Sequence, residues 1–301
     1  MDYKKLIKSR RLRIRIMQAL SFMPDKIVVK VQYRIKTGHS LNLRNPKRYT
    51  EKLQWYKLYY RDPLMSQCSD KYEVRKYVQQ CGLREILNEC YGIYDTPDEI
   101  DFKKLPESFV LKDTLGGGGN SVILVQNKKL MDEKAVRKQM WDWVNEPLNK
   151  KHPGREWVYD NKRHRIIIEK MLMDKDKQDL PDFKFFCFNG SPFCLYLMQN
   201  YTMHHSLGEM GFFDCNYNLL PAYRKDFRPL SNIPSKPQNF EKMVQISKIL
   251  STGFPHVRID LFNINGQIVF GEMTFFNASG YTKFEPDEFD FILGEKFKAN
   301  K

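Results

Sequence analysis

The stretch Val257–Thr274, VRIDLFNINGQIVFGEMT, predicts a β-hairpin. Apolar and polar residues alternate in both halves, which is typical of strands with one buried face and one open face. Asn265-Gly266 lies between the halves and is a pair strongly favoured at the tip of a tight hairpin. Because a hairpin joins antiparallel strands, this stretch indicates an antiparallel sheet in the C-terminal part of the chain.

The length of the turn decides which acidic side chains share a face. A two-residue Asn265-Gly266 turn pairs Asp260 with Gly271 and puts Glu272 on the opposite face. A three-residue loop with a left-handed glycine and a bulge pairs Asp260 with Phe270 instead. We favour the three-residue loop because it buries the apolar residues together. In that register one face carries the four polar side chains Arg258, Asp260, Glu272 and Thr274.

Two carboxylates on one face repel each other unless a cation lies between them. Asp260 and Glu272 therefore predict a site for Mg²⁺, which takes carboxylate oxygens together with nucleotide phosphates as ligands. The alternative is a salt-bridge cluster in which Arg258 neutralises both acids.

A second predicted hairpin has bare backbone at its tip. The strand Phe109–Lys112 is followed by Gly116–Asn120, GGGGN, and then by the apolar run Ser121–Val125. Glycine N–H groups can approach phosphates without obstruction by side chains, and the Lys112 ammonium could reach the same phosphates. The motif is neither G-x-x-x-x-G-K-[ST] nor G-x-G-x-x-G, which excludes a P-loop and a dinucleotide-binding loop. A flexible surface tip without a ligand is the alternative.

The remaining predicted elements define the fold class. Helical periodicity and capping residues predict helices over 51–60, 70–82, 130–150 and 240–250. Apolar runs predict a buried strand over 166–169 and a hairpin of 182–188 with 192–197. This order predicts an α+β chain with several antiparallel hairpins, and not the regular βαβ alternation of a doubly wound sheet.

Length and composition exclude several classes of protein. The chain has 301 residues, 42% hydrophobic and 14% aromatic, which suits about two folded domains. It contains no apolar run near the ~18 residues of a membrane span, and its start lacks the apolar block of a secretory signal. Its six cysteines form no C-x-x-C motif, so they predict reduced thiols of a cytoplasmic protein and not a structural zinc site.

The net charge of +14 belongs to the first part of the chain. Residues 1–80 contain 20 Lys and Arg against 6 Asp and Glu, which accounts for all of it. Within 4–15, seven cations interleave with apolar side chains, which could place this segment on anionic lipid at the inner face of the membrane or on an anionic polymer. A solvated basic helix packed on the protein body is the alternative. Since the rest of the chain is neutral, we expect no nucleic-acid partner.

Taken in order, these motifs resemble the ATP-grasp superfamily. The resemblance is closer still to the TupA-like ATP-grasp family, which is associated with bacterial surface-polysaccharide and teichuronopeptide synthesis. The matching stretches span residues 25–295 and are NPKRYTEKLQWYKLYYRDPL, SDKYEVRKYV, FVLKDTLGGGGN, RIIIEKML, DFKFFCFNG, VRIDLFNINGQIVFGEMTF and KFEPDEFD. The resemblance implies an ATP-grasp fold in which two α+β lobes with antiparallel sheets clasp ATP. It implies a basic helical N-terminal segment over 1–65, a smaller lobe with the glycine-rich loop over 66–165, and a C-terminal lobe with the metal site over 166–301.

The resemblance also implies a role for each matching residue. The phosphates of ATP would be held by the side chains of Lys71, Lys112 and Lys184 and by the loop of Gly116, Gly117, Gly118, Gly119 and Asn120. Adenine would be bound by Glu169 and the backbone at Met171 and Leu172, and ribose by Asp182. Mg²⁺ would be bound by Asp260, Glu272 and Thr274, while Arg258 and Lys112 would act in catalysis. Thr274 stands where the family usually has Asn, and a hydroxyl is a poorer ligand than an amide oxygen, so Asn277 or water is an alternative third ligand.

The implied reaction is the joining of a carboxylate to an amine. Such enzymes phosphorylate a carboxylate with ATP, and an amine then displaces phosphate from the acyl phosphate to give an amide. For this chain the implied acceptor is a uronic acid or another carboxylate of a surface-polysaccharide precursor, joined to an amino acid or amine. Two rival hypotheses are a glycosyltransferase that uses Asp174-Lys175-Asp176 as a metal motif, and a non-enzymatic module that binds polyanions through residues 1–60.

Overall fold

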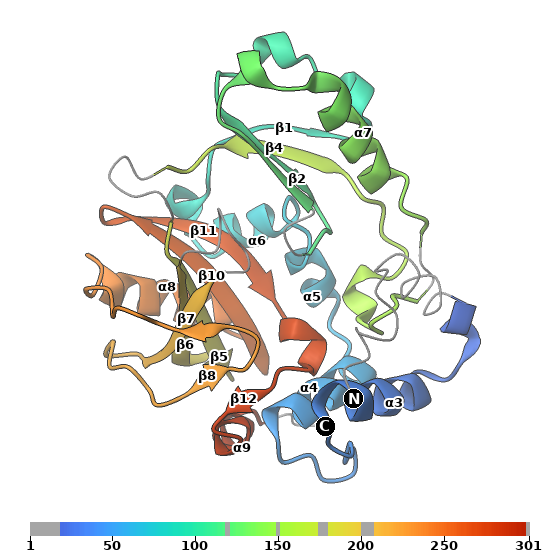
Figure 1. Cartoon of the computed structure of the whole chain (residues 1–301), viewed down its shortest axis with the longest axis vertical. Helices are drawn as coiled ribbons and strands as arrows, with labels where there is room; N and C mark the ends of the chain where they lie inside the picture. The colour runs from blue at the N-terminus through green and yellow to red at the C-terminus, as the bar shows by residue number, and fades with distance from the viewer. Residues whose placement is uncertain (1–18, 118–120, 149–150, 174–179, 200–207, 299–301) are drawn as a thin grey trace.

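The computed structural model describes residues 19–117, 121–148, 151–173, 180–199 and 208–298. Two antiparallel or largely antiparallel sheets form two lobes, with the smaller sheet at the top of Figure 1 and the larger one below it. Short helices connect the lobes. The predicted α+β class with antiparallel hairpins is confirmed.

The smaller lobe is a four-stranded antiparallel sheet covered by one helix. Its strands are β1 (Cys90–Tyr94), β2 (Phe109–Asp113), β3 (Val122–Val125) and β4 (Ile166–Lys170), in the order β1-β4-β2-β3. Helix α7 (Glu133–Val144) buries Met140 and Trp143 in a core shared with Phe109 and Ile168. The sheet includes β4 and therefore continues five residues beyond residue 165, where the boundary between the lobes was predicted.

The larger lobe is a six-stranded sheet in the order β11-β10-β5-β6-β7-β9. Its strands are β5 (Asp182–Phe188), β6 (Ser191–Gln199), β7 (Glu209–Asp214), β9 (Arg228–Pro229), β10 (His256–Ile264) and β11 (Gln267–Thr274). Only the pair β7 and β9 is parallel among these strands. Helix α8 (Phe240–Ser251) packs on the sheet, and β8 (Tyr223–Arg224) pairs with β12 (Phe284–Glu285) beside it.

Helices α3 (Asp25–Thr37), α4 (Tyr49–Tyr59) and α9 (Glu288–Lys296), from the start and the end of the chain, lie together at the base of the larger lobe (Figure 1). Helices α5 (Pro63–Cys68) and α6 (Val74–Gln80), in contrast, pack on each other between the lobes. Helix α4 begins at Tyr49, two residues before the predicted start at residue 51, and the Asp290 carboxylate of α9 accepts hydrogen bonds from the N–H and the hydroxyl of Thr50 in its first turn. The α4 side chains Leu53 and Tyr56 are buried in the main core, so this predicted N-terminal segment is in part built into the larger lobe.

In the C-terminal hairpin the predicted turn length is wrong, but the predicted grouping of polar side chains on one face is confirmed. The turn has two residues, Asn265-Gly266, because Ile264 pairs with Gln267, so the favoured three-residue loop is wrong. A bulge between Asp260 and Leu261 shifts the register, and Asp260 then lies opposite Glu272. The extra residue in the bulge is Gly271, where a Cβ atom would lie 2.9 Å from the Asp260 carbonyl oxygen. The bulge thus brings four side chains to one face, those of Arg258, Asp260, Glu272 and Thr274. The same grouping was predicted, but from a three-residue turn.

Short 3-10 helices fill several connections: η1 (Leu20–Phe22), η2 (Arg84–Ile86), η3 (Pro97–Glu99), η4 (Phe102–Lys104), η6 (Lys128–Leu130), η7 (Trp157–Tyr159) and η9 (Asn277–Gly280). Within the described ranges, every helix is too short or too polar to cross a bilayer.

Candidate active site

A row of polar side chains crosses the larger sheet. Asp260 on β10 lies opposite Glu272 on β11 on one side and opposite Lys184 on β5 on the other. Tyr196 on β6 lies opposite Lys184. Because residues directly opposite each other in a sheet point to the same face, the row collects two acids and a cation from three strands.

Arg258 lies two residues before Asp260 on β10, so it is on the same face, and it binds both acids. Its guanidinium donates to both oxygens of Asp260 at 2.6 and 2.7 Å and to Oε1 of Glu272 at 2.8 Å. Lys184 Nζ lies 2.5 Å from Asp260 Oδ2, and it also pairs with Asp182. The side chains are therefore paired as in the salt-bridge alternative, in which Arg258 neutralises both Asp260 and Glu272.

The two acids differ in exposure and in their free oxygens. The Asp260 side chain is 2% exposed and both of its oxygens accept hydrogen bonds, whereas the Glu272 side chain is 41% exposed. Burial would raise the pKa of Glu272, but the charges of Arg258, Lys184 and Lys71 outweigh it and lower the pKa to about 2. Glu272 is therefore ionised at neutral pH, and of the two acids it is the more accessible oxygen ligand for a metal ion.

This donor set fits Mg²⁺ held jointly with phosphates. Asp260 and Glu272 supply hard oxygen ligands, and Glu272 uses only Oε1 in its hydrogen bonds to the described residues. In the described ranges, no three or more His, Cys, Asp or Glu side chains are arranged so that they alone could hold a metal ion. A magnesium ion at this row would therefore need further ligands from a nucleotide or from water.

Thr274 and Asn277, the two alternatives for a third ligand, both contact Arg258. The guanidinium donates to the Thr274 hydroxyl at 3.0 Å and to the Asn277 carbonyl oxygen. The Thr274 hydroxyl in turn donates to Glu272 Oε1 at 3.2 Å. The Nδ2 atom of Asn277 is buried and has no partner among the described residues. The side chain of Asn277 is thus tied to the site through its oxygen.

Lys112 and Glu169 face each other on neighbouring strands of the smaller sheet. The Lys112 ammonium lies 2.7 Å from Glu169 Oε2, and Arg75 on α6 donates to Oε1 at 3.1 Å. Glu169 was predicted to bind adenine, but both of its oxygens are engaged by these two cations. Arg75 did not stand out in the sequence, since nothing local to α6 indicates a partner 94 residues away.

Lys71 and the first glycine of the loop lie together. The Lys71 backbone N–H donates to the carbonyl of Thr114, and its ammonium donates to the carbonyl of Gly116. Burial lowers the pKa of Lys71, because the ammonium loses part of its hydration. A Cβ at Gly116 would overlap the Ser121 side chain, whereas Gly117 has open space around it. Gly118, Gly119 and Asn120 lie outside the described residues, as do Asp174 and Asp176 of the rival metal motif.

A hollow of about 290 Å³ lies at the segment predicted to hold adenine. Met171 and Leu172 line one side, directly after β4. Ile264 and Val269 of the C-terminal hairpin line the other side. The hollow is therefore bounded by both lobes, and its lining combines apolar side chains that could pack on a planar base with polar ones such as Glu89 and Gln267.

Asp182 and two residues just before β4, His164 and Arg165, make ion pairs. Asp182 pairs with Lys184, and its Oδ1 is buried without a partner among the described residues. His164 Nδ1 lies 2.8 Å from Asp113, the last residue of β2, and Arg165 pairs with Glu73 at 3.1 Å. Both side chains are thus held by acids of the smaller lobe and of the turn before α6.

Comparison with protein families gives one match, to the model described as TupA-like ATPgrasp, over residues 51–298. Comparison with curated proteins gives no match.

Similar solved structures include three ligases or synthetases. D-alanine–D-alanine ligase from Bacillus anthracis is 17% identical, with 69% of this chain and 57% of that chain covered and a TM-score of 0.40. D-alanine–D-alanine ligase from Helicobacter pylori is 12% identical, with coverages of 85% and 68% and a TM-score of 0.45. N5-carboxyaminoimidazole synthetase from Staphylococcus aureus with ADP is 13% identical, with coverages of 83% and 56% and a TM-score of 0.44. This chain thus spans little more than half the length of the first and third.

Proposed function

Because the chain belongs to the TupA-like ATP-grasp family, we propose that it is an ATP-dependent carboxylate–amine ligase that works through an acyl phosphate. The observation that carries the proposal is the row of Lys184, Asp260 and Glu272 with Arg258 beside it. Sheet pairing alone places these charges on one face, and no covalent nucleophile is needed for phosphoryl transfer.

The residues of the smaller lobe supply the phosphate contacts in this proposal. Lys71 and Lys112 are cations on the turn before α6 and on β2, and Gly116 begins the loop next to them. Lys112 and Arg75 share Glu169, so a nucleotide phosphate can replace the carboxylate as the partner of Lys112 without leaving Glu169 unpaired. The backbone at Met171 and Leu172 holds the adenine in the hollow between the lobes.

The residues of the larger lobe hold the metal and the reacting groups. Glu272 and Asp260 would hold Mg²⁺, which would supply positive charge to neutralise the phosphates of ATP. Arg258 stabilises the charge that develops as a carboxylate oxygen of the acceptor attacks the γ-phosphorus and ADP leaves. An amine then attacks the acyl carbon, phosphate leaves, and the amide forms.

We further propose that the acceptor carboxylate belongs to a uronic acid or a similar group on a surface-polysaccharide precursor, and that the amine is an amino acid or another small amine. The family association supports this choice.

Nucleotide binding is tested by thermal unfolding. We expect ATP with Mg²⁺ to raise the melting temperature, and Glu272→Ala to abolish the increase. Glu107→Ala, at an exposed site in the smaller lobe, is the control and should keep it. An increase with a sugar nucleotide and Mn²⁺, but none with ATP, would contradict the ligase and favour the glycosyltransferase.

The reaction is tested by ADP release. Pairs of carboxylates and amines, with uronic acids included, are screened with ATP and Mg²⁺. We expect ADP release that depends on the carboxylate and an amide product visible by mass spectrometry. ATP binding without release for any uronic acid would refute the acceptor and leave the nucleotide site intact.

A further inference from the structure

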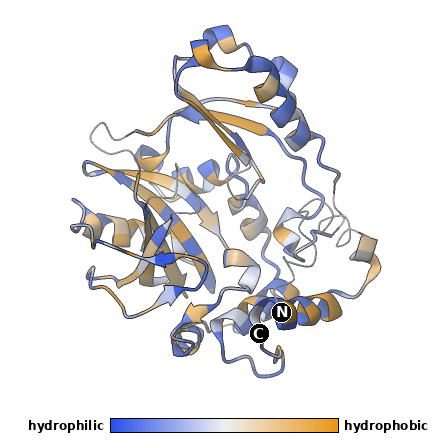
Figure 2. Cartoon of the chain, in the orientation of Figure 1, coloured by the Kyte–Doolittle hydropathy of each residue, from blue (hydrophilic) through white to orange (hydrophobic). Residues whose placement is uncertain are grey.

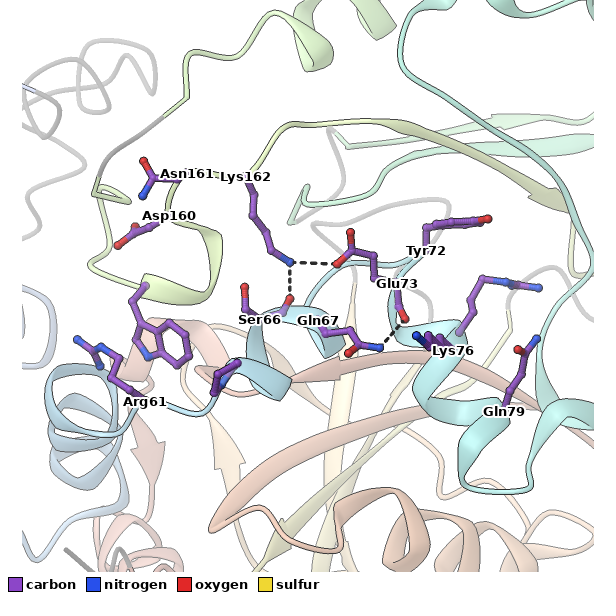
Figure 3. Close-up of a pocket in the computed structure, with 13 residues that line it drawn as sticks. Arg61, Ser66, Gln67, Tyr72, Glu73, Lys76, Gln79, Asp160, Asn161 and Lys162 are labelled. Carbon is purple, nitrogen blue, oxygen red and sulfur yellow. Dashed lines mark hydrogen bonds and ion pairs between the residues drawn. The ribbon is translucent and has the colours of Figure 1, made fainter.

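A long open hollow of about 1070 Å³ lies beside α5 and α6 and is distinct from the adenine hollow (Figure 3). Its lining comes from the end of α4, from α5 and α6, and from the segment 157–162. Figure 3 shows the side chains spread along it, from Arg61 and Asp160 at one end to Lys76 and Gln79 at the other. An elongated shape suits an extended ligand better than a compact one.

The hollow has an excess of positive charge. Its lining includes the cations Arg61, Arg75, Lys76 and Lys162 and the acids Glu73 and Asp160. Lys162 lies 3.6 Å from Glu73, and Arg75 pairs with Glu169 outside the hollow. In the described part of the chain, Arg61 donates to backbone carbonyls and Lys76 has no carboxylate within 4 Å. An anion in the hollow would therefore meet two cations without a carboxylate partner.

Aromatic and amide side chains complete the lining. The Arg61 guanidinium lies over the Trp157 ring, 5.1 Å from its centre, so a cation and an aromatic side chain contact each other at one end of the hollow. Tyr72 and the amides of Gln67 and Gln79 line the rest. Flat aromatic surfaces pack against the C–H face of a sugar ring, amides bind hydroxyls, and cations bind carboxylates.

We propose that this hollow binds an anionic saccharide, namely the uronic-acid part of the acceptor. The inference rests on the proposed ligase function. Tyr72 and Glu73 directly follow Lys71, and Arg75 shares Glu169 with Lys112. The hollow and the nucleotide site therefore share the turn before α6, so an oligosaccharide in the hollow lies next to the proposed phosphate contacts.

The test is calorimetric titration of the full chain with trigalacturonate, with neutral maltotriose as the comparison ligand. We expect trigalacturonate to bind and maltotriose to bind at least tenfold more weakly. Lys76→Glu, at an exposed site, should weaken trigalacturonate binding about tenfold, because attraction becomes repulsion. Arg61→Gln should weaken it as well. Lys248→Glu on α8, the same reversal at an exposed site outside the hollow, should leave it unchanged.

The outcomes separate the hollow from the ligase. Absence of trigalacturonate binding while ATP still raises the melting temperature would overturn the saccharide site alone. Equal affinities for the Lys76 and Lys248 variants would also overturn it. Trigalacturonate binding without any ATP binding would refute the ligase and keep the saccharide site.

A second, independent inference comes from the outward face of α3. Two columns of exposed side chains run along it at four-residue spacing, one basic and one apolar: Lys26, Lys30 and Arg34, with Ile27, Val31 and Ile35. The three apolar side chains belong to residues that are 46%, 51% and 49% exposed. Figure 2 shows this helix at the lower edge of the molecule with apolar and polar residues alternating along it. The acid of the first turn, Asp25, pairs with Lys151 and Arg155.

The charge of this face limits what can cover it. A second copy would place cations against cations, and so would residues 4–15 of the same chain, which carry seven cations and no acid. The partner must offer negative charge to the basic column and apolar groups to the other. An anionic lipid bilayer offers both at its interface. Phe22, 81% exposed just before α3, extends the apolar column.

We infer that α3 docks the protein on an anionic bilayer. The test is flotation with phosphatidylcholine vesicles with and without phosphatidylglycerol. We expect binding only with phosphatidylglycerol, and about tenfold weaker partitioning for the combined variant Lys30→Glu/Arg34→Glu and for Ile27→Ser/Val31→Ser. Ile249→Ser, an exposed apolar site on α8, is the control.

Removal of residues 1–17 separates the two basic regions. We expect the shortened chain to keep part of its binding, and that part to be lost in the α3 variants. Full loss on truncation, with the α3 variants binding normally, would overturn the inference. A change of oligomeric state in the α3 variants without a change in flotation would also overturn it, because a second copy would then cover the face.

Discussion

Arg258 stabilises the row of acids on the larger sheet, and its replacement by methionine tests this directly. Its side chain is 8% exposed and donates to Asp260, Glu272, Thr274 and Asn277. Methionine keeps much of the volume but leaves the Asp260 carboxylate, 2% exposed, with Lys184 as its only cation in hydrogen-bond contact among the described residues.

The expected loss follows from the charge left behind. Counting Arg258, Lys184, Asp182, Asp260 and Glu272, the cluster changes from a net charge of −1 to −2. Removal of one partner of a buried ion pair costs about 3–5 kcal/mol. At about 2–4 °C per kcal/mol, Arg258→Met should lower the melting temperature by about 10 °C.

A second substitution checks that the orphaned charge is the cause. Arg258→Met/Asp260→Asn restores the net charge of −1, so the double variant should be more stable than the single one. The matched control is Arg224→Met. Arg224 is equally buried, but its partner Asp226 is 60% exposed and stays hydrated, so the loss should be about 1 kcal/mol or less.

Stability is measured by urea unfolding followed by tryptophan fluorescence and by calorimetry. If Arg258→Met costs no more than Arg224→Met, the network does not hold the sheet. If Asp260→Asn adds its full cost to that of Arg258→Met, the buried charge is not what destabilises the single variant.

Three further predictions concern the smaller lobe and the bulge. Lys112→Ala should weaken ATP binding about tenfold more than Lys128→Ala in calorimetric titration, because the Lys128 ammonium only binds backbone carbonyls; equal affinities would contradict the phosphate role. Burial opposes protonation of His164, but the Asp113 carboxylate outweighs it and raises the pKa. This pair therefore stabilises the protein below the ordinary histidine pKa and loses its effect as the pH rises through the raised pKa. Asp113→Asn should thus lower the melting temperature more at about pH 5 than at about pH 8, and equal losses would exclude the linkage. Gly271→Ala should cost about 1–3 kcal/mol in urea unfolding, since its Cβ would crowd a facing carbonyl oxygen; unchanged stability would show that the bulge relaxes freely.

Most elements were predictable because their signals are local. The C-terminal hairpin follows from alternation around Asn265-Gly266, and β5 with β6 follows from a similar pattern. The shift in register was not predicted, although a glycine inside a strand, as at Gly271, often marks a bulge. Strand β1 was missed, since Cys90–Tyr94 is short. Helix α3 was covered only by the helical segment expected over 1–65, and its bounds were not predicted, since it exposes apolar side chains on its outward face.

The candidate site was predictable as a set of residues and not as a set of contacts. Asp260, Glu272 and Arg258 lie in one hairpin, so their common face follows from strand periodicity. Glu169 is different, because its partners Lys112 and Arg75 are 57 and 94 residues away in the chain.

The sequence by itself determined the hairpins, the acidic and basic residues of the site and the basic character of the first eighty residues. Each of these depends on interactions between residues close in the chain, where strand alternation, turn chemistry and charge act directly. Only the tertiary structure decided that Lys184 joins the acidic row, that Glu169 is held by two cations, and that Arg61 and Trp157 meet in one hollow. Those contacts depend on how the two sheets and the connecting helices pack, which no short stretch of the chain encodes.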